Sequence, residues 1–385
     1  EFVEMFKAPI KMLHPLLTAT QERNFKGTEG FGSIPFDGII LAHSNESEWQ
    51  QFRNNKTNEA FLDRVYIVKV PYCLRVSEEV KIYEKLLEHS SLNKAPCAPG
   101  TLNMMAQFSV LTRLKEPANS NLFSKMRVYD GENLKDVDPH AKPIQEYRDQ
   151  SGPDEGMNGS STRWAYKVLS KVFNFDHHEV AANPVHLLYV LEQQVIKDNL
   201  PEEQTRKYLD FIKSYLTPKY AEFVAKEIQT AYLESYSEYG QNLFERYIQF
   251  ADKWIQNEEF RDPATGQIFD RDSLNDELNR IEKPAGIANP KDFRNEVVNF
   301  VLRAQASNSG TMPAWTSYEK LREVIERSMF SKTEDLLPVI SFDHKGSKES
   351  QEKHENFVDR MVAKGYTEKQ VRLLVEWHLR VKKAS

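Results

Sequence analysis

The chain has 385 residues, of which 28% are charged and 40% hydrophobic, and its formal net charge is −6. This length is enough for two or three domains with a sizeable core. The charges of both signs are interspersed, which argues against a nucleic-acid-binding protein with its clustered Lys and Arg. Two cysteines, Cys73 and Cys97, are too few for a disulfide framework, and their spacing fits neither a CxxC motif nor a zinc ribbon.

The chain carries no apolar run near the roughly 20 residues that a membrane helix needs, and it shows no signal peptide. We therefore expect no membrane partner and, with so few cysteines, a cytoplasmic location. The sequence opens without a Met, inside a mixed apolar and acidic stretch, so we expect a fragment of a longer protein.

The first stretch, Glu1–Phe6, taken alone favours a solvated helix face that carries Glu1 and Glu4. A loop with three glycines follows at residues 27–33. It leaves a predicted helix and enters a predicted strand, whereas a phosphate-binding loop leaves a strand and opens a helix. We therefore predict a flexible hairpin loop here and no phosphate site.

Two short apolar runs predict buried strands near residues 38–43 and 65–70, because each is short, β-branched and closed by polar or turn residues. Asn45 follows the first run, and Arg64 directly precedes the second. Ligands of open parallel sheets bind outside the carboxyl ends of the strands, so these two side chains could serve a phosphate site. The stretch alone favours the alternative, a turn asparagine and a surface arginine.

The sequence after Pro71 predicts mainly helices. Ser77 is the expected N-cap of a helix through Leu87, and a second helix is predicted over residues 102–114. Residues 115–157 lose this periodicity and accumulate Pro, Gly, Asn and Asp. They predict a long loop, and loops of that length are usually functional or mobile.

A further helix is predicted over about residues 160–172, opened by capping serines and a threonine. Arg163 lies at its start, where a positive charge opposes the helix dipole, so it is either a surface arginine or has a partner outside the helix. From Pro184 onward almost everything is predicted to be helical, with capping boxes at Thr316–Glu319 and Thr367–Gln370.

One cluster has the side-chain types of a metal site, namely Asp176, His177, His178, Glu179 and His186. Zinc sites on helices prefer His at positions i and i+4, and adjacent histidines point apart. We therefore predict no metal site among these residues.

Several stretches carry a resemblance to a known family. They are EFVEMFKAPIK at 1–11, GIILAHSNESEW at 38–49, NNKTNEAFLDRVYIVKVPYCLRVSEE at 54–79, MNGSSTR at 157–163 and EKPAGIANPKDFRNEVVNFVLRA at 282–304. Through them the chain resembles the PrkA family of serine protein kinases, which join an AAA+ ATPase module to a helical C-terminal domain. The resemblance covers essentially all 385 residues.

The resemblance implies a mainly α protein with an N-terminal remnant of an α/β P-loop core. Residues 1–125 would be the C-terminal part of the AAA+ module, including lid helices, and residues 126–385 the PrkA helical domain. The helix near 160–172 would be the sensor helix of the lid. The phosphate loop GxxxxGK[ST] does not occur in the sequence and is expected upstream.

The resemblance also implies roles for individual residues. Glu4 would orient water at a strand end, Asn45 would orient the attacking water or hydroxyl, and Arg163 would reach the γ-phosphate. Arg64 would act as an arginine finger on the nucleotide of a neighbouring subunit, with Arg53 as the alternative finger. The implied cofactors are ATP and Mg²⁺.

This sequence departs from the family pattern at Val3, which replaces the aspartate that usually precedes Glu4. The departure puts Mg²⁺ ligation in doubt. Pieces of a conventional kinase site occur at Tyr129–Gly131 and Tyr147–Asp149, but in the wrong order, so we do not predict such a site.

Three functions remain as hypotheses. The first is an ATP-dependent serine/threonine protein kinase of the PrkA type, which acts on a protein substrate and forms a homo-oligomer through its AAA+ module. The second is an AAA+ mechanical ATPase for remodelling or proteolysis, with a helical partner-binding domain. The third is a non-enzymatic helical scaffold for oligomerisation. Fold resemblance alone does not choose among them.

Overall fold

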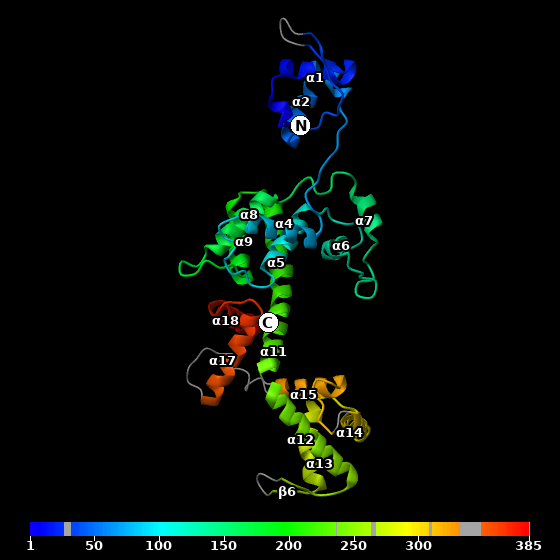
Figure 1. Ribbon diagram of the computed structural model, residues 1–385, viewed down its shortest axis with the longest axis vertical. Coiled ribbons are helices and arrows are strands. Elements are labelled where there is room, and N and C mark those ends of the chain that lie inside the picture. The colour runs from blue at the N-terminus through cyan, green and yellow to red at the C-terminus, as the bar shows by residue number, and fades with distance from the viewer. Residues whose placement is uncertain (27–31, 236, 263–266, 308–309, 332–347, 385) are drawn as a thin grey trace. The chain divides into compact units, whose positions relative to one another are not determined.

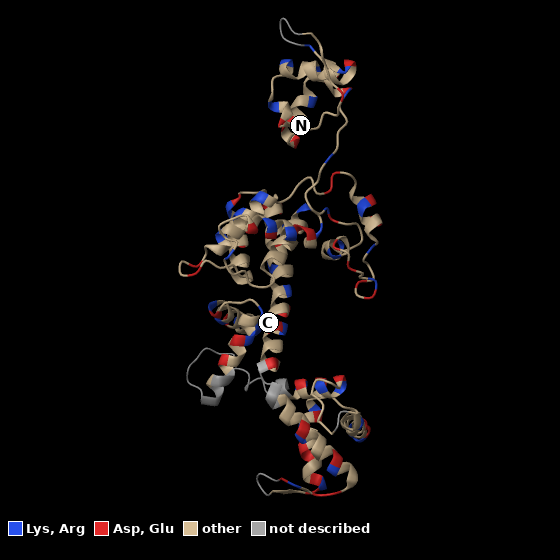
Figure 2. Ribbon diagram, in the orientation of Figure 1, with Lys and Arg blue, Asp and Glu red and all other residues tan. Residues whose placement is uncertain are grey.

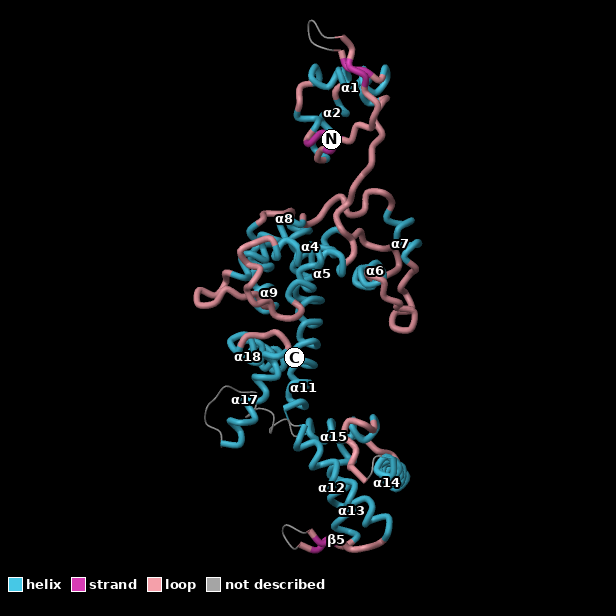
Figure 3. Tube along the Cα trace, in the orientation of Figure 1, coloured by secondary structure: helices cyan, strands magenta, loops and turns pink. Residues whose placement is uncertain are grey.

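The computed structural model describes residues 1–26, 32–235, 237–262, 267–307, 310–331 and 348–384. The chain forms two compact units, residues 1–70 and 71–385, which are described separately (Figure 1). Most described residues are helical, and the described strands are two residues long (Figure 3). The mainly α fold class is therefore confirmed, whereas the P-loop remnant stays a prediction.

Unit 1 combines short strands with three α-helices. Its elements are β1 (Phe2–Val3), a 3₁₀ turn (Met5–Lys7), α1 (Ile10–Glu22), β2 (Asn24–Phe25), β3 (Ile34–Pro35), β4 (Ala42–His43), α2 (Glu46–Asn54), a 3₁₀ turn (Lys56–Asn58) and α3 (Glu59–Leu62). Its small core is formed by Met5, Leu13, Leu16, Phe52 and Phe61.

Two strand pairs organise unit 1. β1 runs parallel to β4, with Phe2 opposite Ala42 and Val3 opposite His43. β2 and β3 pair antiparallel, as expected for a hairpin around the glycine loop. Five residues of that loop, 27–31, lie outside the described part of the chain.

The strand predictions are only partly correct. The first predicted strand is reduced to Ala42–His43. The second is wrong, because residues 65–70 form no strand. Tyr66 is 91% and Val70 80% exposed, so most of the apolar side chains that suggest a buried strand face solvent here, and only Val65 packs against the core of unit 1. A strand depends on ladder hydrogen bonds to a neighbour, which an apolar run does not supply by itself.

Unit 2 is almost entirely helical. Its helices are α4 (Val76–Glu88), α5 (Thr101–Arg113), α6 (Leu122–Tyr129), α7 (Ile144–Ser151), α8 (Thr162–Phe173), α9 (Pro184–Lys197), α10 (Glu202–Asp210), a π-helix (Phe211–Leu216), α11 (Thr217–Ser235), α12 (Ser237–Gln256), α13 (Arg271–Glu282), a 3₁₀ turn (Lys283–Ala285), α14 (Pro290–Ser307), α15 (Glu319–Ser331), α17 (Lys348–Ala363) and α18 (Glu368–Ala384). The strands β5 (Phe260–Arg261) and β6 (Ile268–Phe269) form a hairpin.

The long loop predicted over residues 115–157 is wrong, because it contains α6 and α7. The side chain of Lys125 is fully buried in α6, so the polar residues that suggest a loop are held by tertiary contacts. Ser77 does not cap α4 with its own side chain. Instead its amide and hydroxyl both donate to the Asp130 carboxylate, at 2.8 and 2.7 Å.

Of the two capping boxes, only the C-terminal one forms. The Thr367 amide donates to Gln370 at 3.0 Å, and the Gln370 amide donates to the Thr367 hydroxyl at 3.3 Å. The other box is wrong, because α15 begins at Glu319, which leaves Thr316 three residues before the helix.

Positions of positive and negative residues are interspersed along the chain in both units (Figure 2). Within the described residues, no helix combines the length and apolarity needed to cross a bilayer.

Candidate functional site

The first candidate site lies where two parallel strands end. Glu4 follows β1 directly, and Ser44 and Asn45 follow β4. Because β1 and β4 are parallel neighbours, their carboxyl ends meet at one edge of the sheet. The structure thus brings together two residues, Glu4 and Asn45, that the sequence places 41 positions apart.

Lys7 links the two strand ends. Its ammonium group lies 2.7 Å from Oε2 of Glu4 and 3.4 Å from Oε1 of Glu48, which belongs to the first turn of α2. The hydrogen bond to Glu4 raises the pKa of Lys7, so the lysine stays cationic between the two carboxylates.

The carboxylate of Glu48 is held by several donors. It accepts from the Ser44 hydroxyl at 3.0 Å and from Nδ2 of Asn45 at 2.9 Å. Loss of water contact pushes its pKa up, but the hydrogen bonds from Ser44, Asn45 and Lys7 outweigh that effect and lower it. We call Glu4, Lys7, Ser44, Asn45 and Glu48 the strand-end cluster.

Asn45 is also the N-cap of α2. Its Oδ1 accepts from the Glu48 amide at 2.9 Å and from the Ser47 hydroxyl at 2.8 Å. Both polar atoms of its side chain therefore have local partners, as the turn-asparagine alternative expects, and a role toward water or nucleotide stays a prediction. The same contacts fix the direction in which the Nδ2 group points, which a water-orienting residue also requires.

Glu4 adopts an uncommon backbone conformation, with φ 53° and ψ 44°. Left-handed backbone is rare for residues other than Gly, Asn and Asp, and such positions cluster at functional sites. The turn lets the chain leave β1 and enter the 3₁₀ turn that carries Lys7. Within the described residues, the contacts of Glu4 engage Oε2 and leave Oε1 without a hydrogen bond.

Sequence reasoning missed Lys7, Ser44 and Glu48. The spacing Asn45-x-x-Glu48 is a helix-start signature and could have identified Glu48. No sequence signal singles out Lys7, because its role depends on the pairing of β1 with β4.

The donor set does not fit a Mg²⁺ site as arranged. Carboxylate, amide and hydroxyl oxygens are suitable ligands for Mg²⁺. Here, however, the ammonium group of Lys7 occupies the place between the two carboxylates, and Val3 supplies no ligand. Among the described residues, no group of three or more His, Cys, Asp or Glu is placed to hold a metal ion.

The two predicted finger residues lie elsewhere in unit 1. Arg64 follows α3, is exposed, and donates to the Ala60 carbonyl at 2.5 Å and to Oε1 of Gln21 at 3.3 Å. Arg53 lies in the last turn of α2 and is exposed. Among the described residues, neither arginine makes a hydrogen bond or an ion pair with the strand-end cluster.

Arg163 belongs to unit 2, in the first turn of α8. Ser161 caps this helix, since its hydroxyl accepts from the Trp164 amide at 3.1 Å. The chain that leads into α8 requires glycine at position 159. The φ of Gly159 is +105°, and a Cβ there would lie 2.6 Å from the Thr112 carbonyl oxygen. Arg163 is exposed at the predicted helix start.

Comparison with protein families covers almost the whole chain. A family described as the PrkA AAA domain matches residues 1–121, and one described as the PrkA serine protein kinase C-terminal domain matches residues 123–377.

Curated relatives carry two different names. The chain is 73% identical over 385 residues to a protein named serine/threonine kinase YeaG from Escherichia coli K12, and it covers 60% of that protein. It is 34% identical over 347 residues, 89% of this chain, to a protein named ATP-dependent protease PrkA from Bacillus subtilis 168, of which it covers 53%.

The chain thus spans between half and two thirds of the length of these relatives. No solved structure matches it. The two family matches together cover nearly every described element of both units, so the chain belongs to the PrkA family.

Proposed function

We propose that this PrkA-family protein is a serine/threonine kinase that transfers the γ-phosphoryl group of ATP to a hydroxyl of a protein substrate. The observation that carries the proposal is the 73% identity, over the full chain, to a relative named as a serine/threonine kinase. The match to a PrkA AAA domain supports the use of ATP.

The strand-end cluster suits such a reaction. Phosphoryl transfer depends mainly on positioning the attacking oxygen and on neutralising charge. Glu4 offers Oε1 as an acceptor for the proton of the attacking hydroxyl, while Lys7 holds Oε2. Asn45 presents its amide from a fixed helix start. ATP, when bound, supplies the phosphoryl group, and no residue described here forms its phosphate cradle.

The second candidate function is an ATP-driven machine linked to proteolysis. It is favoured by the name of the Bacillus subtilis relative, ATP-dependent protease PrkA. Both candidates require ATP and the same AAA module, and they differ in where the phosphoryl group goes.

The destination of the label decides between them. The natural full-length protein is incubated with [γ-³²P]ATP and an unphosphorylated acceptor such as casein, and label on serine or threonine is measured beside free phosphate and acceptor cleavage. A kinase puts label on the acceptor. Free phosphate and cleaved acceptor, with no protein label, would contradict the kinase proposal and favour the machine.

A further inference from the structure

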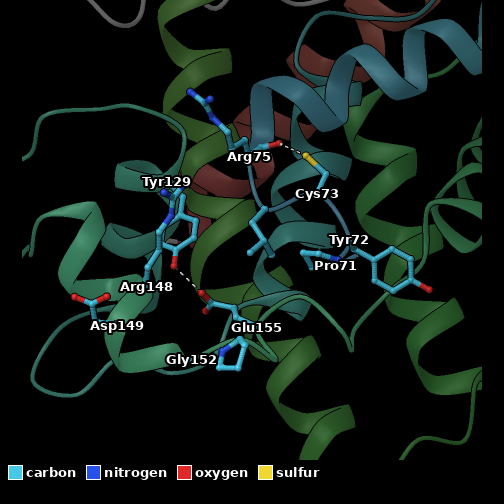
Figure 4. Close-up of a pocket in the computed structure, with 11 residues that line it drawn as sticks. Pro71, Tyr72, Cys73, Arg75, Tyr129, Arg148, Asp149, Gly152 and Glu155 are labelled. Carbon is cyan, nitrogen blue, oxygen red and sulfur yellow. Dashed lines mark hydrogen bonds between the residues drawn. The ribbon is translucent and has the colours of Figure 1, made fainter. Parts of the chain in front are cut away.

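Unit 2 contains an open pocket of about 800 Å³ (Figure 4). Its walls are the segment 71–75, which precedes α4, and five residues from the end of α7 and the turn after it, namely Arg148, Asp149, Gly152, Pro153 and Glu155. Tyr129, the last residue of α6, closes a third side. The pocket contains no residue of the strand-end cluster.

The wall formed by segment 71–75 is held rigidly. The Tyr72 amide donates to the Gly156 carbonyl at 2.9 Å. Gly156 has φ +80°, and a Cβ there would lie 2.9 Å from Cβ of Pro71, so only glycine allows this approach. The buried Arg113 donates to the Cys73 carbonyl at 2.8 Å and also pairs with Glu79. Contacts within the protein therefore hold this wall of the pocket in place without a ligand.

The carboxylate at the pocket floor is already neutralised. Glu155 is 6% exposed, and its Oε1 accepts from the buried ammonium group of Lys125 and from the Lys115 amide. The Tyr129 hydroxyl donates to Oε2 at 2.6 Å, as the dashed line in Figure 4 shows. A buried carboxylate with these partners leaves no negative charge to repel an anion.

Two arginines supply excess positive charge to the lining. Arg75 and Arg148 are both exposed, and within the described residues no hydrogen bond or ion pair is recorded for either guanidinium group. Figure 4 shows Arg148 beside Tyr129. The other lining carboxylate, Asp149, accepts a hydrogen bond from Gln145 on its own helix at 2.9 Å. When Glu155 and Lys125 are counted as a neutral pair, the remaining charged lining residues are two arginines and one aspartate.

We propose that this pocket binds a phosphate monoester. A guanidinium group binds phosphate through paired, charge-assisted hydrogen bonds. Two such groups suit a doubly charged phosphate monoester better than a ligand that carries a single carboxylate. Pro71, Leu74 and Pro153 add apolar wall for the organic part of the ligand, and the volume far exceeds that of the anion alone. A phosphorylated peptide side chain and a small phosphorylated metabolite share this chemistry.

The test uses the whole chain at fixed ionic strength and measures binding of two probes by calorimetry. One is a pentapeptide with a central phosphoserine, and the other is glycerol 2-phosphate. We expect Arg75→Gln combined with Arg148→Gln to weaken binding by about tenfold or more, because charge-assisted hydrogen bonds are lost. Arg206→Gln is the matched control, since Arg206 is an exposed arginine of α10 outside the pocket, and it should leave binding unchanged.

The probes distinguish the two sources. A peptide that binds at least about tenfold more tightly than glycerol 2-phosphate supports a phosphorylated protein segment, and equal affinities support a small phosphate ester. No binding of either probe to the unmodified chain, or equal binding by the double variant, would overturn the proposal. If the double variant fails to fold by circular dichroism, Arg148→Gln alone gives the same comparison, because Arg148 lies on an exposed face of α7.

This proposal is independent of the kinase proposal. Loss of phosphoryl transfer on changing the strand-end cluster would leave phosphate-ester binding in unit 2 intact. Loss of binding in the double variant would not by itself affect transfer of label to casein.

Discussion

At the scale of single residues, the strand-end cluster shows how one side chain can serve structure and chemistry at once. Asn45 caps α2 through Oδ1 and contacts Glu48 through Nδ2. A substitution that removes the side chain would therefore change stability and activity together, and the two effects could not be separated. Aspartate keeps the capping oxygen and removes the Nδ2 donor.

We expect Asn45→Asp to keep the helix cap, because Asn and Asp cap helices about equally well, and to cost less stability than Asn45→Ala even though the new carboxylate lies near Glu48. ATP turnover by the natural protein should fall about tenfold or more, because the positioned amide donor is lost and a carboxylate faces Glu48. Asn45→Ala should in addition cost about 1 kcal/mol of stability. Steady-state turnover measures activity, and urea unfolding measures stability. Normal turnover by Asn45→Asp would show that Asn45 acts only as the N-cap of α2.

A second prediction concerns His186 in α9. Burial lowers the pKa of this imidazole below its ordinary value of 6.5, although the negative charge of Asp176 partly opposes the shift. Its Nδ1 lies 2.9 Å from Nδ2 of Asn183, which favours the neutral ring as acceptor. Below pH 6.5 the unfolded chain binds the proton more readily, so stability falls as the pH is lowered from 6.5 through the folded pKa.

We expect His186→Phe to flatten that dependence, because an aromatic ring is kept beside Phe175, where the ring centres now lie 4.5 Å apart in a tilted arrangement, while the proton site is lost. The effect is small, less than about 1 kcal/mol, since the ring is partly solvated. Urea midpoints at pH 7.5 and 5.5 measure it for both proteins. Equal losses of stability in the two proteins would show that His186 does not contribute.

At the scale of elements, buried ion pairs join helices of unit 2. Arg294 of α14 and Glu282 of α13 are 1% and 2% exposed. They form two parallel hydrogen bonds of 2.8 Å, and the Tyr247 hydroxyl of α12 donates to the same carboxylate at 2.8 Å. The guanidinium group also lies 4.4 Å from the centre of the Trp254 ring. Three helices thus share one polar contact inside an apolar core.

We expect Arg294→Met to destabilise unit 2 by about 3–5 kcal/mol, because it leaves Glu282 buried without its counter-charge. Combining it with Glu282→Met and Tyr247→Phe should recover most of this loss, since no fully buried polar group then lacks a partner and only the half-buried Asn275 and Asn279 lose a donor. Thermal or urea unfolding measures both variants. A cost below about 1 kcal/mol for Arg294→Met would mean that water reaches Glu282 and the pair is not isolated from solvent.

Sequence patterns predicted the helices near 77–87, 102–114 and 160–172 closely, although only the third begins with a side-chain cap of the predicted kind, from Ser161. The sequence patterns failed where contacts between distant parts of the chain determine the local structure. Residues 65–70 have strand-like composition and yet form no strand, and α6 has loop-like composition and yet buries Lys125 completely.

The candidate site was predictable to a similar extent. Glu4 and Asn45 were identified through the resemblance to the PrkA family, and the parallel pairing of β1 with β4 brings them together. Lys7 was missed, because nothing near it in the sequence reveals that it contacts Glu48. The arginines of the phosphate-ester pocket were missed as a site, because the pocket joins segments about 75 residues apart in the sequence.

At the scale of the whole molecule, the chain forms two units, and the predicted site residues are divided between them. Glu4, Asn45 and Arg64 belong to unit 1 and Arg163 to unit 2. The predicted role of Arg64 reaches beyond a single copy of the chain, since an arginine finger acts on the nucleotide of a neighbouring subunit. An exposed guanidinium group suits this role.

We expect Arg64→Ala to lower ATP turnover by about 10³-fold or more without loss of folding, as for other arginine fingers. Arg53→Ala tests the alternative finger in the same unit. Mixing Arg64→Ala subunits with Glu4→Gln subunits should restore part of the activity, because some interfaces then combine an intact Glu4 with an intact Arg64. Normal turnover in Arg64→Ala would exclude the finger role, and a loss confined to Arg53→Ala would assign it to Arg53.

The most direct test of the account is single-turnover transfer from [γ-³²P]ATP by the natural full-length protein with Glu4→Gln. Glutamine keeps the size of the side chain and removes its proton acceptor. The matched control is Glu1→Gln, which changes an exposed glutamate at the other end of β1, 3.6 Å from His43. We predict that Glu4→Gln lowers label transfer to serine and threonine by about 10²-fold or more, while Glu1→Gln does not. Equal transfer by both variants would contradict a catalytic strand-end cluster.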